Sequence, residues 1–446
     1  MFKTWLFLIG IILISSKTFC QNTAIPDSNF EQALIDEGLD TPPLNGQVPT
    51  SNISGITDLD VKGKSIQDLT GIEDFLALQN LDCSENQITS LTTSTLSNLR
   101  ILWCFNNRIT NLNIEANTEL TALRCENNTI SSLNLLNNTN LVDLTCENNS
   151  ITNLNVTSNL SLSRFQCDNN LLSSLDVSYN SNLSYLSCSG NQIQNLNVIN
   201  NISLKVLLCS NNQISTLNIS QNSTLTDLNC SSNILCQLLI NNGNNNNMTD
   251  LDFSNNADLN CVVVDDANGN HSTWLPSGFS NYVNSNEDCS TFIPVDVLDD
   301  FIGRTYILPI ISHGHYYTEP KGNGTQLNIG ETITNSQTIY IYNEINCYSN
   351  ESNFNVIITD NDYFIPKFFT PNNDGFNDAW VVFDYDHSIN NVSIFNRNGK
   401  LLKFLSGASL KWDGTYNGAQ MNTDTYWYEI VLNTGEVLRG YFALKR

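Results

Sequence analysis

The chain has 446 residues, which is too long for one compact core, so two to four domains are expected. Its formal net charge of −25, with only 19 Lys and Arg residues, argues against partners such as nucleic acid or an anionic membrane. Charged residues make up only 14% of the chain, and this composition favours strands and turns in an extracellular protein over long helices.

Residues 1–20 have the pattern of a secretory signal. Lys3 supplies the positive charge, and the apolar stretch 5–14 is too short to span a bilayer. Cleavage near Cys20 is expected; lipidation of Cys20 is the alternative, although residues 17–19 do not fit a lipidation motif. No later segment reaches the ~20 apolar residues of a transmembrane helix. The sequence therefore predicts Sec export to the periplasm, with no membrane span.

Residues 21–58 are predicted to form an N-terminal cap. The segment 25–35 has the apolar spacing of a short helix, with Asp27 or Ser28 as its cap. An irregular first repeat follows, beginning at Leu59.

A 21-residue period runs through the next part of the chain. It is marked by eight cysteines, each followed three residues later by an asparagine. A fixed period of this length indicates a solenoid, in which each unit buries its apolar face against its neighbours. The cysteines are Cys83, Cys104, Cys125, Cys146, Cys167, Cys188, Cys209 and Cys230. The asparagines are Asn86, Asn107, Asn128, Asn149, Asn170, Asn191, Asn212 and Asn233.

The full pattern of a unit is L-x-C-x-x-N-x-I-x-x-L-x-V-x-x-N-x-x-L, and it resembles a bacterial leucine-rich repeat. The resemblance implies a solenoid over residues 59–260, with a short strand around each Leu-x-Cys pairing in parallel with the next. The return segments are expected to be extended and turned, because 21 residues leave little room for a helix. The cap resembles that of leucine-rich repeat proteins of the Bacteroidota. Some of these carry a calcium-loop-like stretch at this point, but residues 40–46 lack its carboxylates, so no metal site is predicted.

The asparagine and the cysteine of each unit have predictable structural roles. A buried Asn amide both donates and accepts, so stacked asparagines can satisfy backbone groups where the strand ends. Free cysteine behaves as a small buried hydrophobe, and buried thiols are the favoured interpretation of the cysteines. Scattered disulfides between adjacent units are one alternative, and a metal site is another.

After Asn233 the period slips into a looser ninth unit, in which Phe253 occupies the cysteine position. Residues 261–290 then read as a C-terminal cap. Cys261 and Cys289 bracket this segment, and in an oxidising compartment they are expected to form a disulfide.

Residues 291–358 alternate in polarity, which predicts strands separated by glycine turns. The elements Tyr306-x-Leu-Pro309 and Gln337–Tyr342 resemble an Ig-like module of secreted Bacteroidota proteins, and this implies a β-sandwich. A cysteine that relatives carry before the first element is absent here.

Residues 361–446 carry several separated motifs: 364–380 (FIPKFFTPNNDGFNDAW), 392–400 (VSIFNRNGK), 412–418 (WDGTYNG), 424–428 (DTYWY) and 440–446 (GYFALKR). Together they resemble the gliding-motility-associated, type B C-terminal sorting domain of type IX secretion substrates. One departure is Asn398, where relatives have an aromatic residue. The resemblance implies a β-sandwich that engages the type IX secretion machinery, and therefore a final location at the cell surface or outside the cell.

No motif for catalysis or for a cofactor is present. The four histidines lie outside metal-binding frames, and there is no phosphate-binding glycine loop and no nucleophile elbow. Residues 372–378 could hold calcium, but their spacing differs from an EF-hand and favours a turn. We therefore expect a protein that is not an enzyme and has no cofactor.

The outward positions of the predicted sheet are the candidate binding face. Several hold charged pairs such as Arg124 with Glu126, and most of the others hold Ser, Thr or Asn, so three neighbouring apolar residues stand out: Ile101, Trp103 and Phe105. Either the N-terminal cap covers them or they form an exposed hot spot for a partner. The predicted ligand-binding residues are Ile101, Trp103, Phe105, Arg124, Arg164 and Tyr185.

The sequence as a whole predicts a mainly β chain: a leucine-rich-repeat solenoid, an Ig-like β-sandwich and a C-terminal β-sandwich sorting domain. The expected function is adhesion or binding, with an unidentified protein or glycan ligand held on the concave face. The alternative is a structural stalk or matrix protein, whose repeats bind nothing.

Overall fold

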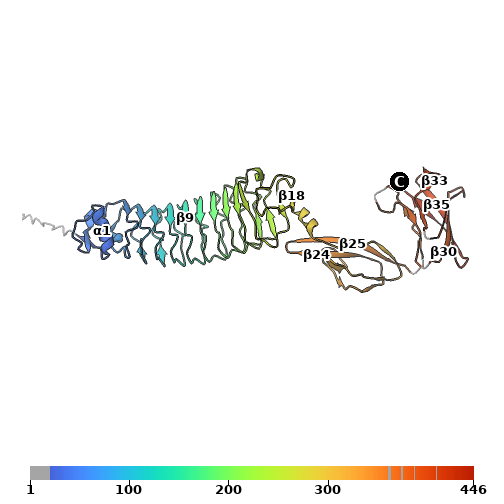
Figure 1. Ribbon diagram of the computed structural model, residues 1–446, viewed down its shortest axis with the longest axis horizontal. Coiled ribbons are helices and arrows are strands. Elements are labelled where there is room, and N and C mark those ends of the chain that lie inside the picture. Colours follow the sequence, from blue (N-terminus) through green and yellow to red (C-terminus); the bar gives the residue numbers. More distant parts are fainter. Residues whose placement is uncertain (1–20, 360–362, 373–374, 386, 408) are drawn as a thin grey trace, which may run out of the picture. The chain divides into compact units, whose positions relative to one another are not determined.

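The computed structural model describes residues 21–359, 363–372, 375–385, 387–407 and 409–446 (Figure 1). The predicted signal segment lies outside these residues. The chain divides into two compact units at Cys289 and Ser290. The prediction of a mainly β chain with a parallel solenoid followed by β-sheet domains is confirmed.

A small cap closes the N-terminal end of the solenoid. It consists of β1 (Asn22–Ala24), α1 (Ser28–Asp36), β2 (Gln47–Pro49) and α2 (Thr50–Ile53). Asp27 is the N-cap of α1, where Oδ1 accepts from the N–H groups of residues 29 and 30. Its Oδ2 accepts from the N–H groups of residues 67 and 68, so one carboxylate ties the helix to the first repeat.

The solenoid contains one ten-stranded parallel sheet, whose strands stack along the unit (Figure 1). Each strand is three residues long and lies one repeat from the next. Each places its central apolar residue in the core. The strands are β3 (Asp58–Asp60), β4 (Asn80–Asp82), β6 (Ile101–Trp103), β8 (Ala122–Arg124), β9 (Asp143–Thr145), β10 (Arg164–Gln166), β11 (Tyr185–Ser187), β12 (Val206–Leu208), β14 (Asp227–Asn229) and β16 (Asp250–Asp252).

The return segments of the repeats are turns and short strands, as predicted. Two pairs of residues form β5 (Leu91–Thr92) and β7 (Leu112–Asn113). Nearer the C-terminal end, a second parallel sheet contains β13 (Thr216–Asn218), β15 (Gln237–Leu239), β17 (Val262–Val263) and β18 (Tyr282–Val283). The 3-10 turns η1 (Ile72–Asp74) and η2 (Asn245–Asn247) complete the solenoid.

The C-terminal cap covers the open end of the repeat core. Phe253 replaces the cysteine of the last unit and packs edge-on against Phe279, with 5.2 Å between ring centroids. Cys261 and Cys289 form a disulfide with 5.6 Å between their Cα atoms. The 3-10 segment η3 (Glu287–Phe292) ends the cap.

The region predicted as Ig-like contains a five-stranded sheet in the order β19-β25-β24-β21-β22 and a separate pair, β20 and β23. The alternating residues 339, 341, 354 and 356 point into its core, as their period of two predicts. The strands are β19 (Phe301–Gly303), β20 (Tyr306–Ile307), β21 (His315–Tyr317), β22 (Gln326–Leu327), β23 (Thr332–Ile333), β24 (Gln337–Ile345) and β25 (Tyr348–Ile358).

The C-terminal module is built on a five-stranded sheet in the order β27-β36-β35-β30-β31. Three strand pairs accompany it: β26 with β29, β28 with β32, and β33 with β34. Trp380 and Trp412 are buried in its core. The strands are β26 (Tyr363–Phe364), β27 (Phe368–Phe369), β28 (Trp380–Val381), β29 (Phe383–Asp384), β30 (Ile389–Phe395), β31 (Leu401–Ser406), β32 (Lys411–Trp412), β33 (Thr415–Tyr416), β34 (Ala419–Gln420), β35 (Asp424–Leu432) and β36 (Val437–Leu444).

Candidate functional site

Each strand of the solenoid sheet turns two side chains outward. Because side chains alternate along a strand, burial of the central residue leaves the first and third residues on the opposite face, which we call the strand face. The register places equivalent residues of successive strands side by side. The first-position row is Asp58, Asn80, Ile101, Ala122, Asp143, Arg164, Tyr185, Val206, Asp227 and Asp250. The third-position row is Asp60, Asp82, Trp103, Arg124, Thr145, Gln166, Ser187, Leu208, Asn229 and Asp252.

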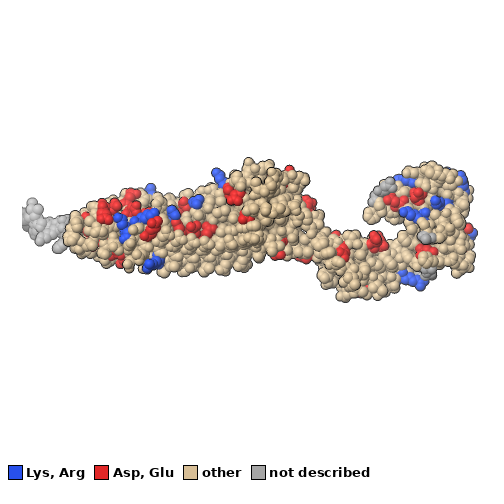
Figure 2. All heavy atoms as spheres, viewed as in Figure 1, with Lys and Arg blue, Asp and Glu red and all other residues tan. Residues whose placement is uncertain are grey.

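Charged side chains are unevenly distributed along the solenoid. Figure 2 shows Asp, Glu, Lys and Arg gathered toward its N-terminal half on the visible face, whereas the remainder is mostly uncharged. In the two rows of the strand face, the basic residues Arg124 and Arg164 lie on β8 and β10, whereas acidic residues occur toward both ends.

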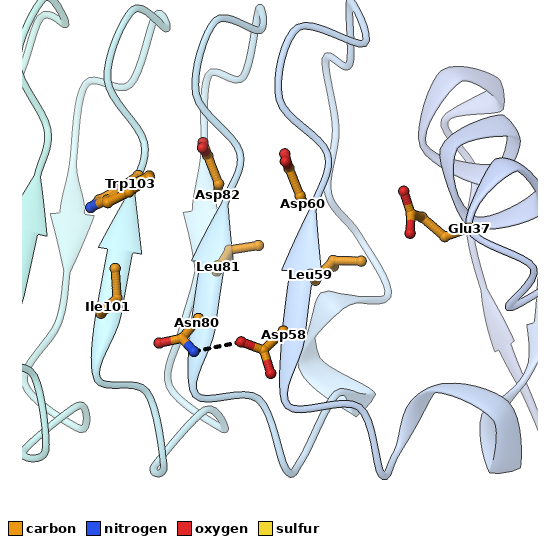
Figure 3. Close-up of a pocket in the computed structure, with 9 residues that line it drawn as sticks. All are labelled: Glu37, Asp58, Leu59, Asp60, Asn80, Leu81, Asp82, Ile101 and Trp103. Atoms are coloured by element: carbon orange, nitrogen blue, oxygen red, sulfur yellow. Dashed lines mark hydrogen bonds between the residues drawn. The ribbon is translucent and has the colours of Figure 1, made fainter.

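A groove of about 390 Å³ lies on the first three strands, beside the end of α1. Trp103 forms one wall with 37% of its surface exposed, and Figure 3 shows Glu37 at the opposite side. Four carboxylates and no Lys or Arg line this N-terminal groove, so it attracts cationic groups and offers hydrogen-bond acceptors. The lining residues are Glu37, Asp58, Leu59, Asp60, Asn80, Leu81, Asp82, Ile101 and Trp103.

Local hydrogen bonds fix three of the four carboxylates of the N-terminal groove. Asp58 accepts from Nδ2 of Asn80 at 2.6 Å, and this bond, with one from Thr57, lowers the pKa of Asp58 (Figure 3). Asp60 and Asp82 each accept the backbone N–H two residues later, both at 3.0 Å. These contacts orient the acids before any ligand arrives, which reduces the entropy lost on binding.

Two of the three predicted apolar residues lie in the N-terminal groove, and the third does not. Ile101 and Trp103 line it. The expectation that Phe105 is exposed is wrong, because only 8% of its surface is accessible. The guanidinium of Arg124 lies 4.5 Å from its ring centroid, and Nζ of Lys62 lies 5.5 Å away. These cations from neighbouring repeats cover the ring; the N-terminal cap contributes Glu37 to the border of the groove.

The predicted arginines occupy the middle of the strand face. Arg124 forms an ion pair with Glu126, whose side chain is only 4% exposed. Arg164 lies over the ring of Tyr185, 4.1 Å from its centroid, and its Nε donates to Oε1 of Gln166 at 3.0 Å. Both guanidiniums are thus held between an aromatic ring and an acceptor, which fixes their positions.

Acidic side chains between the two arginines are partly buried. Burial raises the pKa of Glu147, and the charges of Asp168 and Glu126 raise it further. Burial also raises the pKa of Asp143, against the opposing effect of Arg164 and Arg124. Asp143 lies in the first-position row of the strand face, whereas Glu147 lies two residues beyond the end of the same strand.

The asparagines of the predicted ladder form the hydrogen bonds expected of them. Asn170 accepts from the Ile151 N–H at 3.0 Å and donates to the carbonyls of Cys146 and Cys167 at 3.0 and 3.1 Å. The other members repeat this arrangement: Asn86, Asn107, Asn128, Asn149, Asn191, Asn212 and Asn233. Asn256 continues it in the ninth unit, by accepting from the N–H of Leu235. We call this the outer ladder.

A second, inner ladder lies in the return segments. Asn180 is fully buried and donates to the carbonyls of Val156 and Asn159 at 3.0 and 2.8 Å. The sequence also indicates this ladder, because each unit contains a weaker copy of its own pattern. Asn117 follows Ile114 by three residues, as Asn107 follows Cys104. The members of the inner ladder are Asn117, Asn138, Asn159, Asn180, Asn201 and Asn222.

The eight cysteines of the 21-residue period are free thiols and fully buried. Burial raises the pKa of each thiol, so the reactive thiolate is disfavoured. Within the described residues, no group of three or more His, Cys, Asp or Glu side chains is placed to hold a metal ion. The thiols therefore serve as packing groups of the core.

Comparison with protein families identifies two parts of the chain. Residues 363–444 match the CHU_C type IX secretion signal domain, and residues 77–116 match two copies of leucine-rich repeats. The chain carries leucine-rich repeats and a type IX secretion signal domain. No curated protein sequence matches it significantly.

Solved structures similar to this chain include proteins of two bacteria. The functional domain of InlJ from Listeria monocytogenes, described as including a cysteine ladder, is 20% identical, and the match covers 95% of this chain and 99% of that chain with a TM-score of 0.49. An internalin (inlF) of the same organism is 21% identical over 54% of this chain and 84% of that chain, with a TM-score of 0.40. A leucine-rich repeat protein of Leptospira interrogans is 26% identical over 40% and 49%, with a TM-score of 0.38.

The secretion signal domain places the protein at the cell surface or in the extracellular space. It also implies contact with the type IX secretion machinery. None of the helices in the described residues is long and apolar enough to cross a membrane.

Proposed function

We propose that the leucine-rich repeats form a non-enzymatic binding module of an exported adhesion protein, which recognises a protein or glycan ligand at the N-terminal part of the strand face. The observation that carries the proposal is the N-terminal groove, because it combines an exposed Trp103 with four carboxylates, three of them oriented by local hydrogen bonds. Elsewhere the outward rows mix polar, charged and apolar residues, and their large apolar side chains, Tyr185, Val206 and Leu208, are only half-exposed.

The chemistry of the groove suits either class of ligand. An indole ring can stack on the apolar face of a sugar or on an aliphatic side chain. The carboxylates accept hydrogen bonds from sugar hydroxyls and attract Lys or Arg side chains of a protein. Arg124, Arg164 and Tyr185 extend the same face toward the C-terminal end of the solenoid, so a longer ligand would meet both regions.

The test uses the purified chain without its signal segment, screened against glycan and surface-protein arrays. Trp103→Ala removes the wall of the groove, and Asp60→Asn removes a charge while keeping the acceptor for the backbone N–H. Tyr179→Ala is the matched control, because this tyrosine is 62% exposed but lies outside the sheet strands. Phe105 is left intact, since its removal would release Arg124.

Loss of binding in Trp103→Ala, with binding retained in Tyr179→Ala, is the expected result. Binding that survives Trp103→Ala would place the site elsewhere on the solenoid, and Arg164→Ala would be tested next. If the unaltered chain binds nothing on either array, the structural-stalk interpretation is favoured.

A further inference from the structure

The five-stranded sheet of the secretion signal domain has one face in the core and one face toward solvent. Ile394, Ile430 and Phe442 point inward and are fully buried. On each of these strands, the residues before and after the buried one point to the opposite face, because neighbouring side chains of a strand alternate. This solvent face is far more apolar than the exterior of a β-sandwich requires.

A row of large apolar side chains crosses four strands of the solvent face. The register pairs Leu401 with Phe395, Phe395 with Trp427, and Trp427 with Tyr441. Direct partners in a sheet lie about 5 Å apart, so the four side chains are neighbours. Leu401 is 47%, Trp427 40% and Tyr441 70% exposed. We call these four residues the aromatic row.

A groove of about 340 Å³ lies beside the aromatic row. Phe395 and Trp427 form part of it, together with the exposed Arg397 and with Arg439. Nε of Arg439 donates to Oε2 of Glu429 at 2.8 Å, so this guanidinium is already oriented. The face therefore offers an apolar patch with a basic border.

The charge of this domain differs from that of the rest of the chain. Residues 361–446 contain nine acidic side chains and eight of the chain's 19 basic ones, so the domain is nearly neutral within a protein of net charge −25. The basic residues are Lys367, Arg397, Lys400, Lys403, Lys411, Arg439, Lys445 and Arg446. A partner of this domain would therefore meet a surface of nearly balanced charge.

We propose that the aromatic row is the surface through which a component of the type IX secretion machinery recognises this domain. The family match makes the domain a secretion signal, so some surface of it must be recognised by the secretion machinery. A partner cannot contact the buried aromatic residues of the core in a folded domain, whereas the aromatic row and its groove are accessible. The complementary partner surface is apolar, with carboxylates placed to meet Arg397 and Arg439.

The test follows export of the full-length chain in a bacterium that has type IX secretion. The double variant Trp427→Ser/Tyr441→Ser removes the centre of the row. Tyr385→Ser is the control in the same domain, because Tyr385 is 37% exposed but lies outside both the five-stranded sheet and the sequence motifs. The measured quantity is the amount of chain at the cell surface and in the medium relative to the amount in the periplasm. Thermal unfolding of each purified variant reports whether the domain folds.

The double variant is expected to lower the exported fraction about tenfold or more, as the loss of hot-spot residues does in other interfaces, while Tyr385→Ser is exported normally. Should the double variant fold poorly, Tyr441→Glu decides, because it places a charge at the most exposed position of the row without touching the core. Normal export of a folded row variant overturns the proposal. So does an equal loss of export in the Tyr385→Ser control.

Discussion

Asparagines of the outer and inner ladders differ in what their removal leaves unpaired. Leucine matches the branching of asparagine but has no polar atoms, so Asn170→Leu deletes hydrogen bonds with little change in shape. The N–H of Ile151 then loses its acceptor in the core. The carbonyls of Cys146 and Cys167 each keep a hydrogen bond, because Asn149 still donates to the first and Asn191 to the second. One buried donor is left unsatisfied.

The same substitution at Asn180 leaves no such group. The carbonyl of Val156 still accepts from the N–H of Asn159 at 3.0 Å, and the carbonyl of Asn159 still accepts from the N–H of Leu162 at 3.1 Å. Oδ1 of Asn180 is buried with no hydrogen-bond partner, so leucine also removes an unpaired acceptor. Asn180→Leu is therefore expected to cost much less stability than Asn170→Leu.

An unsatisfied buried donor costs about 1–3 kcal/mol. Local opening of the solenoid should become about 5- to 150-fold more frequent in Asn170→Leu and change little in Asn180→Leu. The free thiols provide the assay, because they are buried in the folded solenoid. Each purified variant is mixed with a thiol reagent under native conditions, and the labelling rates of Cys146 and Cys167 are measured by peptide mass spectrometry.

Equal labelling rates in the two variants, both faster than in the unaltered chain, would refute this account. The cost would then arise from packing around leucine, and the number of donors left unpaired would be irrelevant. Asn191→Leu serves as a second outer-ladder variant, because it removes the acceptor of the Leu172 N–H in the same way.

Three further predictions concern other sites in the solenoid. Burial raises the pKa of Glu147 in the folded chain, so the contribution of this residue to stability falls as pH rises through that pKa. Glu147→Gln should therefore raise the midpoint temperature of thermal unfolding at pH 7, and this gain should vanish below the ordinary glutamate pKa. Gly190→Ala should cost at least about 1–2 kcal/mol in chemical denaturation, because φ is +67° and the new Cβ would lie 2.3 Å from Oδ1 of Asn169. Replacing Cys261 and Cys289 by serine should destabilise the C-terminal cap by about 3–4 kcal/mol, given the 28-residue separation, as limited proteolysis of the cap would report.

The solenoid and its outer ladder could be predicted because they depend on a repeated local rule. Every unit that places an asparagine three residues after its cysteine meets the same backbone groups, so one unit explains all of them. The secretion signal domain was also recognised from its motifs, since these combine glycine turns with core aromatics such as Trp380 and Trp412.

The binding face could be predicted only in part. Trp103 was found because an exposed aromatic stands out among small polar residues. Phe105 was misjudged because its burial depends on two cations from other repeats. The acids of the N-terminal groove could not be predicted, because three of them flank Leu59 and Leu81, where the repeat pattern is least regular, and the fourth, Glu37, lies in the cap.

The hydrogen bonds of the outer ladder between units all run in one direction along the solenoid. Each asparagine reaches back to the preceding unit and none reaches forward, so a unit is completed only when the next one has folded against it. A chain folding from its N-terminus would thus always end in one unfinished unit, until Asn256 supplies the final acceptor. Removing or duplicating one whole period between the caps would restore the same partners. The number of repeats, and with it the length of the strand face, can therefore change in evolution while both caps stay as they are.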